Sequence, residues 1–172
     1  MSALQAQAIG TRRLDLLPLG VEHAEEMAAV LSDPALHTFT GGTPDTPHAL
    51  RSRYRRLAAG SPDPAVSWLN WVIRLRDVSC LTGTVQATVS PSDYGPIAEI
   101  AWVVGTPWQG RGIAGEAARG LVAWLTRQPV HTVIAHIHPD HRASAAVATA
   151  AGLTPTGEWH EGEIRWRRGP GR

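Results

Sequence analysis

The sequence predicts a mixed α/β or α+β fold, in which helices cover both faces of one sheet. Segments with alternating apolar residues, typical of strands, are interleaved with segments whose apolar residues recur at helical spacing. Two neighbouring alternating segments, residues 67–76 and 81–90, are joined by a short turn and indicate a hairpin. A chain of 172 residues, 43% of them hydrophobic, suits one domain over residues 1–172.

The N-terminal part predicts one strand followed by two helices. Residues 12–19 form the expected strand, and residues 21–33 form a helix that ends before Pro34. The apolar positions of this helix are Ala24, Met27, Ala28 and Leu31. The second helix covers residues 48–60, since Thr46 before it is a suitable N-cap.

The middle of the chain predicts three consecutive strands. The strand at 67–76 has one apolar face, and the strand at 81–90 alternates more strictly. The apolar residues of the first strand are Leu69, Trp71, Ile73 and Leu75. Residues 97–104 are largely apolar on both faces, which indicates a central strand covered on both sides.

The C-terminal part predicts helices alternating with strands. A helix at 113–125 is supported by apolar residues four positions apart, and a strand at 131–138 follows it. An alanine-rich helix at 141–151 ends at Gly152. One or more strands that include residues 161–168 complete the sheet.

A glycine-rich loop joins the strand at 97–104 to the helix at 113–125. Gly110 and Gly112 permit close approach to the backbone, where the first helical turn has N–H groups without partners. This arrangement predicts a phosphate site. A P-loop is disfavoured because no lysine follows Gly112. A dinucleotide loop is disfavoured because the next strand supplies Asp140 well beyond the usual spacing of about 20 residues.

The same loop resembles the acyl-CoA pyrophosphate loop of the GNAT superfamily of N-acetyltransferases, which reads Gln/Arg-x-x-Gly-x-Gly/Ala. The matching residues are Gln109, Gly110, Arg111, Gly112, Ile113 and Ala114. The region that follows resembles the RimJ/RimL-type branch, where the next helix commonly reads Asn-x-x-Ser and ends in Gly-Phe. His141 and Ser144 stand at the first of these motifs, and Gly152 and Leu153 at the second. The earlier half of the chain shares only the order of elements.

The resemblance implies a central mixed, mostly antiparallel sheet that splays between its fourth and fifth strands, residues 97–104 and 131–138. It implies acetyl-CoA as co-substrate. The pyrophosphate is expected on the N–H groups of the motif residues, and a strand N–H is expected to hydrogen-bond the thioester oxygen. The other residues expected to contact the cofactor are Trp102, Val103, Val104, His141 and Ser144.

Catalysis by such an enzyme requires a base, because an ammonium with a pKa near ~10 must lose a proton before it attacks. Glu99 stands on the fourth strand where several family members place an acidic base, and we expect it to act directly or through water. The alternative is that Glu99 hydrogen-bonds within the sheet or contacts the acceptor.

The departing thiolate gains from protonation, which many family members supply with a tyrosine. At that position this sequence has Ala148, so Ser144 is the expected donor. The alternative, in which Ser144 caps or packs within the helix, remains open. His141 replaces the usual asparagine and changes the local hydrogen bonding.

Three histidines, His136, His138 and His141, raise the question of zinc. No cysteine or carboxylate lies near them at a recognisable ligand spacing, so we expect no metal. His138 is instead expected to line the acceptor site or to assist proton transfer. The alternative is a solvent-facing loop histidine.

The acceptor is expected beside the loop at residues 37–42, which contains Phe39 and Thr40. Trp68 and Asn70, opposite the apolar face of their strand, are expected to face the acceptor too, as is Glu99. The alternative for the tryptophan is packing on the sheet, as is usual for aromatic residues on strands.

The expected function is an acetyl-CoA-dependent N-acetyltransferase, in which a protein N-terminus or a small-molecule amine attacks the thioester directly in a ternary complex. Cys80 lies in a hairpin turn far in sequence from the cofactor elements, so a covalent acyl-cysteine is not expected. The alternative is a non-catalytic acyl-CoA-binding regulatory module.

Composition limits the partners. A net charge of +1 disfavours nucleic acid, and no apolar run approaches the ~20 residues of a membrane span. One cysteine and the absence of a signal-like N-terminus favour a cytoplasmic protein. The family resemblance adds a possible homodimer.

Overall fold

The structure is a computed structural model that describes residues 4–169. Its strands are β1 (Ile9–Gly10), β2 (Leu14–Pro18), β3 (Ser67–Leu75), β4 (Cys80–Ser90), β5 (Ile97–Val104), β6 (Thr132–Ile137), β7 (Thr154–His160) and β8 (Glu163–Arg168). Its α-helices are α1 (Ala24–Val30), α2 (Pro47–Ala59), α3 (Ile113–Leu125) and α4 (Arg142–Ala150). Three short 3₁₀ turns are η1 (Val21–His23), η2 (Pro34–His37) and η3 (Thr106–Trp108).

The strands form one sheet in the order β1-β2-β3-β4-β5-β6-β8-β7. Every neighbouring pair is antiparallel except β5 and β6, which are parallel. The exception follows from α3, which connects these two strands and returns the chain to the starting end of the sheet. The predicted mixed, mostly antiparallel sheet is confirmed.

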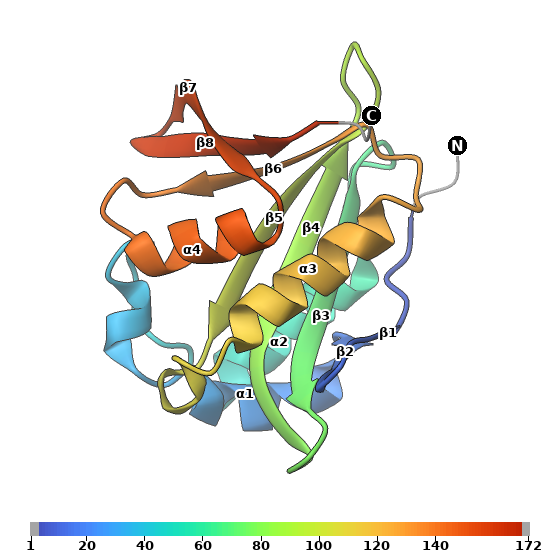
Figure 1. The fold of residues 1–172 in the computed structure, drawn as a ribbon. Coiled ribbons are helices and arrows are strands. Elements are labelled where there is room, and N and C mark those ends of the chain that lie inside the picture. Colours follow the sequence, from blue (N-terminus) through green and yellow to red (C-terminus); the bar gives the residue numbers. More distant parts are fainter. Residues whose placement is uncertain (1–3, 170–172) are drawn as a thin grey trace.

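Helices cover both faces of this sheet, as predicted (Figure 1). In the view shown, α3 and α4 lie in front of the strands and α1 and α2 lie behind them. Trp71, Ile100 and Leu121 belong to the core cluster on the α3 face. Met27 and Val72 belong to a smaller cluster beneath α1 and α2.

The structure corrects the prediction that β5 is covered on both faces. Its central position is right, but Glu99 and Ala101 are exposed while Ala98 and Ile100 on the other face are buried. The reason is that α1 packs against β4 and α2 against β3, so this helix pair leaves that face of β5 open.

Two strands, β1 and β7, were not predicted from the sequence pattern. β1 has two residues, which is too short to show any period. β7 is exposed along nearly its whole length and carries no alternation of buried residues. It pairs with β8 and completes a C-terminal hairpin beside β6.

The predicted splay lies between β5 and β6. Three pairs of residues join these strands, the last being Glu99 with Ile134. Beyond this pair the strands diverge toward their carboxyl ends, with α4 beside β6 (Figure 1). One side of the β5 main chain is thereby left without a neighbouring strand.

Candidate active site

The glycine loop presents a row of free backbone donors. Gly110 and Gly112 adopt φ angles of 78° and 74°, a left-handed conformation that side chains disfavour. Within residues 4–169, the N–H groups of residues 110–115 have no hydrogen-bond acceptor. These groups lie at the N-terminus of α3, where the helix dipole adds positive potential. The loop therefore has the donors and the access that a pyrophosphate requires.

The residues that flank the free donors fix the loop to β5 and α3. The N–H of Gln109 donates to the Thr106 carbonyl at 3.3 Å, so the free donors begin at Gly110. The Gln109 side-chain amide donates to the Val104 carbonyl at 3.0 Å and ties the loop to β5. The Arg111 guanidinium lies 5.2 Å above the ring of Trp108. Ile113 is buried and anchors α3, while Ala114 is half-buried.

An ion pair between the partly exposed Arg13 and the buried Glu116 supports the loop. Glu116 accepts hydrogen bonds from the Arg13 Nε at 2.7 Å, the Arg13 N–H at 2.8 Å and the Thr11 hydroxyl. Burial by itself raises the pKa of Glu116, but these hydrogen bonds and the Arg13 charge outweigh it, and the pKa is lowered. Arg13 also donates to the Arg111 carbonyl at 2.9 Å. Sequence reasoning missed this pair; its one signal was an acidic residue in the first turn of a largely apolar helix.

The open edge of β5 lies next to the loop. The Gly105 N–H donates to the Thr82 carbonyl of β4 at 2.8 Å, so the preceding residue, Val104, turns its carbonyl to the β6 side, where it accepts the Gln109 amide. Backbone groups alternate between the two edges of a strand, so those of Trp102 face the same side and those of Val103 face β4. Within residues 4–169, no residue of β6 pairs with Trp102. Its N–H is available to a ligand that enters between the diverging strands.

Glu99 lies on the uncovered face of β5 beside a buried histidine. Its side chain is 52% exposed, whereas that of His136 on β6 is 6% exposed. Oε2 of Glu99 is 3.3 Å from Nδ1 of His136. The Nε2 atom of the same ring accepts a hydrogen bond from the Nε of Arg165 on β8 at 3.1 Å.

The turn between β6 and α4 gathers His138, His141 and Ser144. Nδ1 of His138 accepts the Asp140 N–H at 3.1 Å, and Nδ1 of His141 accepts the Ser144 N–H at 3.1 Å. His141 is thus the N-cap of α4. The Ser144 hydroxyl lies 3.4 Å from Nε2 of His141. Ala148 is fully buried and faces the core.

The loop before α2 reaches this turn. The ring of Phe39 lies 5.0 Å from that of His138 and 4.4 Å from that of His141. Asp33, which starts the loop, accepts the Thr106 hydroxyl at 2.7 Å. The structure therefore brings Phe39 to the carboxyl end of β6. Thr40 is exposed, and the structure gives it no hydrogen bond among residues 4–169.

Trp68 and Asn70 lie on the same face of the sheet as Glu99, the face that α1 and α2 cover in part. In the sheet, Trp68 pairs with Thr88, which pairs with Glu99, so the three form one row. Strands lie about 4.8 Å apart, which puts Trp68 roughly 10 Å from Glu99. Both Trp68 and Asn70 are half-buried. The face can seat an acceptor between the tryptophan and the carboxylate.

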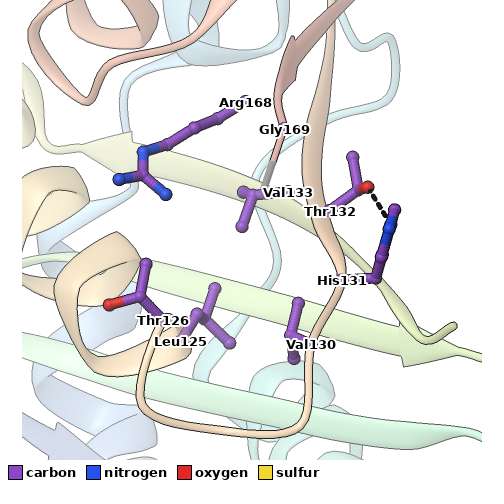
Figure 2. Close-up of a pocket in the computed structure, with 8 residues that line it drawn as sticks. All are labelled: Leu125, Thr126, Val130, His131, Thr132, Val133, Arg168 and Gly169. Atoms are coloured by element: carbon purple, nitrogen blue, oxygen red, sulfur yellow. Dashed lines mark hydrogen bonds between the residues drawn. The ribbon is translucent and has the colours of Figure 1, made fainter. Parts of the chain in front are cut away.

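A small cavity of about 110 Å³ lies elsewhere, between the carboxyl end of α3 and the start of β6. Figure 2 shows Leu125, Val130 and Val133 lining it, with Arg168 above them and a hydrogen bond between His131 and Thr132. This is the opposite end of α3 from Gly112. The cavity is therefore separate from the glycine loop.

Residues 4–169 contain neither a cluster of metal ligands nor a helix that could span a membrane. No group of three or more His, Cys, Asp or Glu side chains gathers there as a metal site requires. No helix there is long and apolar enough to cross a bilayer.

The family follows from comparison with known proteins. A family model described as an acetyltransferase (GNAT) domain matches residues 13–154. The chain therefore belongs to the GNAT acetyltransferase family, and the predicted class of enzyme, an acyltransferase, is confirmed. A search of curated protein sequences finds no match to this chain.

Solved structures share this fold at low sequence identity. A GNAT-family acetyltransferase from Bacillus anthracis superposes with a TM-score of 0.80 at 18% identity, covering 95% of this chain and 99% of that one. The RimL ribosomal L7/L12 alpha-N-protein acetyltransferase, in complex with coenzyme A, gives 0.76 at 17%, covering 95% and 98%. Ribosomal-protein-S5-alanine acetyltransferase from Vibrio fischeri gives 0.76 at 16%, covering 95% and 97%. The fold is thus shared with RimL-type enzymes.

Proposed function

We propose that this protein transfers the acetyl group of acetyl-CoA to a primary amine, by direct attack in a ternary complex. The observation that carries the proposal is the alignment of two features on β5 and its loop. Free N–H groups at 110–115 can hold a pyrophosphate, and Glu99 lies on the uncovered face of the strand that leads to them. One cysteine in the sequence and the intracellular nature of such a donor favour a cytoplasmic location.

The donor would be held by the loop and by β5. Gly110, Gly112 and the α3 N-terminus supply N–H donors to the pyrophosphate, and Arg111 adds charge nearby. The pantetheine would pair along the open edge beside Trp102, Val103 and Val104. The Trp102 N–H would donate to the thioester oxygen as negative charge develops on it.

Glu99 would act as general base, directly or through one water. The carboxylate is half-exposed on the face where an amine can approach. It accepts a proton from the ammonium, whose freed lone pair then attacks the thioester carbon. Removing a general base costs about 100-fold or more in rate.

Ser144 would donate a proton to the departing thiolate and take one back from water, which reaches its partly exposed side chain. The Nδ1 atom of His141 accepts the Ser144 N–H, so the neutral ring carries its proton on Nε2. The Nε2–H is directed at the Ser144 oxygen, which accepts it, so the serine O–H is available to donate to the sulfur. His138 would line the same side of the site together with Phe39.

The acceptor class we favour is the α-amino group of a protein N-terminus. The support is the fold shared with RimL and with ribosomal-protein-S5-alanine acetyltransferase, both named for acting on ribosomal proteins. Small-molecule amines remain the second class, since the similar MccE is named as a microcin C7 self-immunity acetyltransferase. Trp68 and Asn70 would contact the residue next to the amine.

The competing function is an acyl-CoA-binding module without turnover. It fits the buried Ala148, which leaves no tyrosine at the usual acid position. The exposed Glu99 and the serine held by His141 favour an enzyme.

Thiol release tests the proposal. Acetyl-CoA is incubated with peptides that begin with alanine or serine, with amino acids and with polyamines, using wild type and Glu99→Gln. The expected result is turnover with an α-amino peptide, lost about 100-fold in Glu99→Gln while acetyl-CoA binding is unchanged. Binding without turnover on the whole panel supports the non-catalytic module instead. Sedimentation of the same samples tests the expected homodimer.

A further inference from the structure

We propose that His136 is a positioning residue for Glu99. The inference rests on the proposed function, in which Glu99 accepts the proton of the amine. His136 would hold one carboxylate oxygen, Oε2, through its Nδ1–H, so that Oε1 faces the acceptor. The sequence alone does not predict this role for His136, which was considered there only as a metal ligand.

Arg165 selects the tautomer that this role requires. Its Nε donates to Nε2 of His136 at 3.1 Å, which uses the lone pair of that nitrogen. An arginine guanidinium only donates, so the ring proton must be on Nδ1. Nδ1 is the nitrogen that lies 3.3 Å from Oε2 of Glu99. The ring therefore turns a donor, and not a lone pair, toward the carboxylate.

The Nδ1 donor needs Glu99 as its partner. The atom is fully buried, and its geometry toward Glu99 falls short of a hydrogen bond, so it has no partner within residues 4–169. A buried donor without an acceptor is unfavourable. The Glu99 side chain has no other hydrogen bond among those residues and is half-exposed, so a small rotation brings Oε2 into line.

The ring itself is held in place. Its side chain is 6% exposed, and the ring of His160 on β7 stacks on it with centroids 4.7 Å apart. Arg165 fixes one end of the ring from β8. The mobile member of the pair is therefore Glu99, and His136 is the fixed point that orients it.

The chemistry assigns one task to each carboxylate oxygen. Oε2 accepts the hydrogen bond from His136 throughout. The ammonium proton moves to Oε1, the nitrogen lone pair attacks the thioester carbon, and the C–S bond breaks with its electron pair on the sulfur, which takes a proton from Ser144. The second proton of the nitrogen goes to water, and no bond to His136 forms or breaks. Restricting the carboxylate to this orientation raises the fraction of encounters in which proton transfer succeeds, which affects kcat more than donor binding.

Side-chain substitutions separate positioning from packing. His136→Leu removes the donor, His136→Asn places an amide N–H close to the Nδ1 position, and His136→Gln places one near Nε2 instead. His131→Leu is a matched control, because that histidine precedes the same strand and, within residues 4–169, its side chain hydrogen-bonds only to Thr132. Kinetics use acetyl-CoA and a tetrapeptide with an N-terminal alanine, and calorimetry gives the Kd of acetyl-CoA.

The expected result is that His136→Leu lowers kcat by about 10-fold to 100-fold, with KM and Kd for acetyl-CoA within about twofold. His136→Asn recovers most of the rate, His136→Gln does not, and His131→Leu matches wild type. In the Glu99→Gln background, His136→Leu causes little further loss, since both act through one group. Wild-type kcat in His136→Leu, or the same loss in both backgrounds, overturns the inference.

Two controls keep the outcomes distinct. If Glu99→Gln itself turns over at the wild-type rate, the proposed base is wrong and the inference falls with it. If Glu99→Gln is slow but His136→Leu is not, the inference alone fails. Should His136→Leu not fold, the contrast between the asparagine and glutamine variants decides.

Nitrogen NMR of the imidazole provides a readout that needs no acceptor. The inference requires a protonated Nδ1 in wild type and a shift of its signal in Glu99→Gln. A ring protonated on Nε2 contradicts it.

Discussion

Arg13 and Glu116, which lie far apart in the sequence, form an ion pair with 2.7 Å between Nε and Oε1 under the first turn of α3. The same guanidinium donates to the Arg111 carbonyl, so one side chain joins the β1–β2 turn, the helix and the glycine loop. The shape of the predicted phosphate site thus depends on a residue outside the motif that identified it.

Arg13→Met is expected to weaken acetyl-CoA binding. The substitution releases the Arg111 carbonyl and leaves the Glu116 carboxylate without its charge partner, so the loop loses its fixed geometry. We expect Kd to rise on the order of tenfold, about 1.4 kcal/mol. Calorimetry measures it, with Arg12→Met as the control. Equal affinity in both variants would show that the loop is rigid without Arg13.

His141→Ala is expected to destabilise the protein, because it removes the N-cap of α4. Loss of a cap costs about 0.5–2 kcal/mol. His141→Asn restores a short hydrogen-bond acceptor, and its free energy of unfolding should lie within about 0.5 kcal/mol of the wild-type value. Urea unfolding gives both values. If the alanine variant is as stable as the asparagine variant, the hydrogen bond to the Ser144 N–H contributes nothing.

Tyr54 is expected to make stability fall at alkaline pH. Burial raises its pKa to about 12, with Arg53 opposing and Asp45 adding to the shift. A raised pKa in the folded state means that its contribution is complete below the unfolded value of 10.0 and is lost as pH rises toward 12. Tyr54→Phe should flatten this part of the profile. It should also be at least as stable at pH 8, because the buried hydroxyl has no partner in residues 4–169. If the free energy of unfolding falls equally in wild type and Tyr54→Phe above pH 10, groups other than Tyr54 cause the fall.

Local patterns predicted most of the fold. Apolar alternation placed β3 and β4, and the Thr46 cap placed the start of α2, because in each case neighbouring residues alone decide the conformation. The pattern was wrong about the second face of β5, since coverage of a strand depends on where distant helices pack. β7 was not predicted, because a strand exposed along nearly its whole length has no alternation of buried residues.

Part of the candidate site could also be predicted from the sequence, and part could not. The glycine loop was readable because φ angles near 75° and free N–H groups demand glycine at two fixed positions. His136 had been weighed only as a metal ligand, and its contact with Glu99 depends on the register of β5 and β6. Arg13, Asp33 and Arg165 were missed, because each acts across elements that only the fold brings together.

The most direct measurement is a calorimetric titration of acetyl-CoA into wild type, Gly112→Val and Gly157→Val. Gly112 has a left-handed φ of 74°, whereas Gly157 has open space around it and an ordinary backbone, so it serves as the matched control. We predict micromolar binding to wild type and Gly157→Val, and none to Gly112→Val. Unchanged binding in a folded Gly112→Val would contradict the placement of the donor on the glycine loop, and no binding to wild type would remove acetyl-CoA as the substrate.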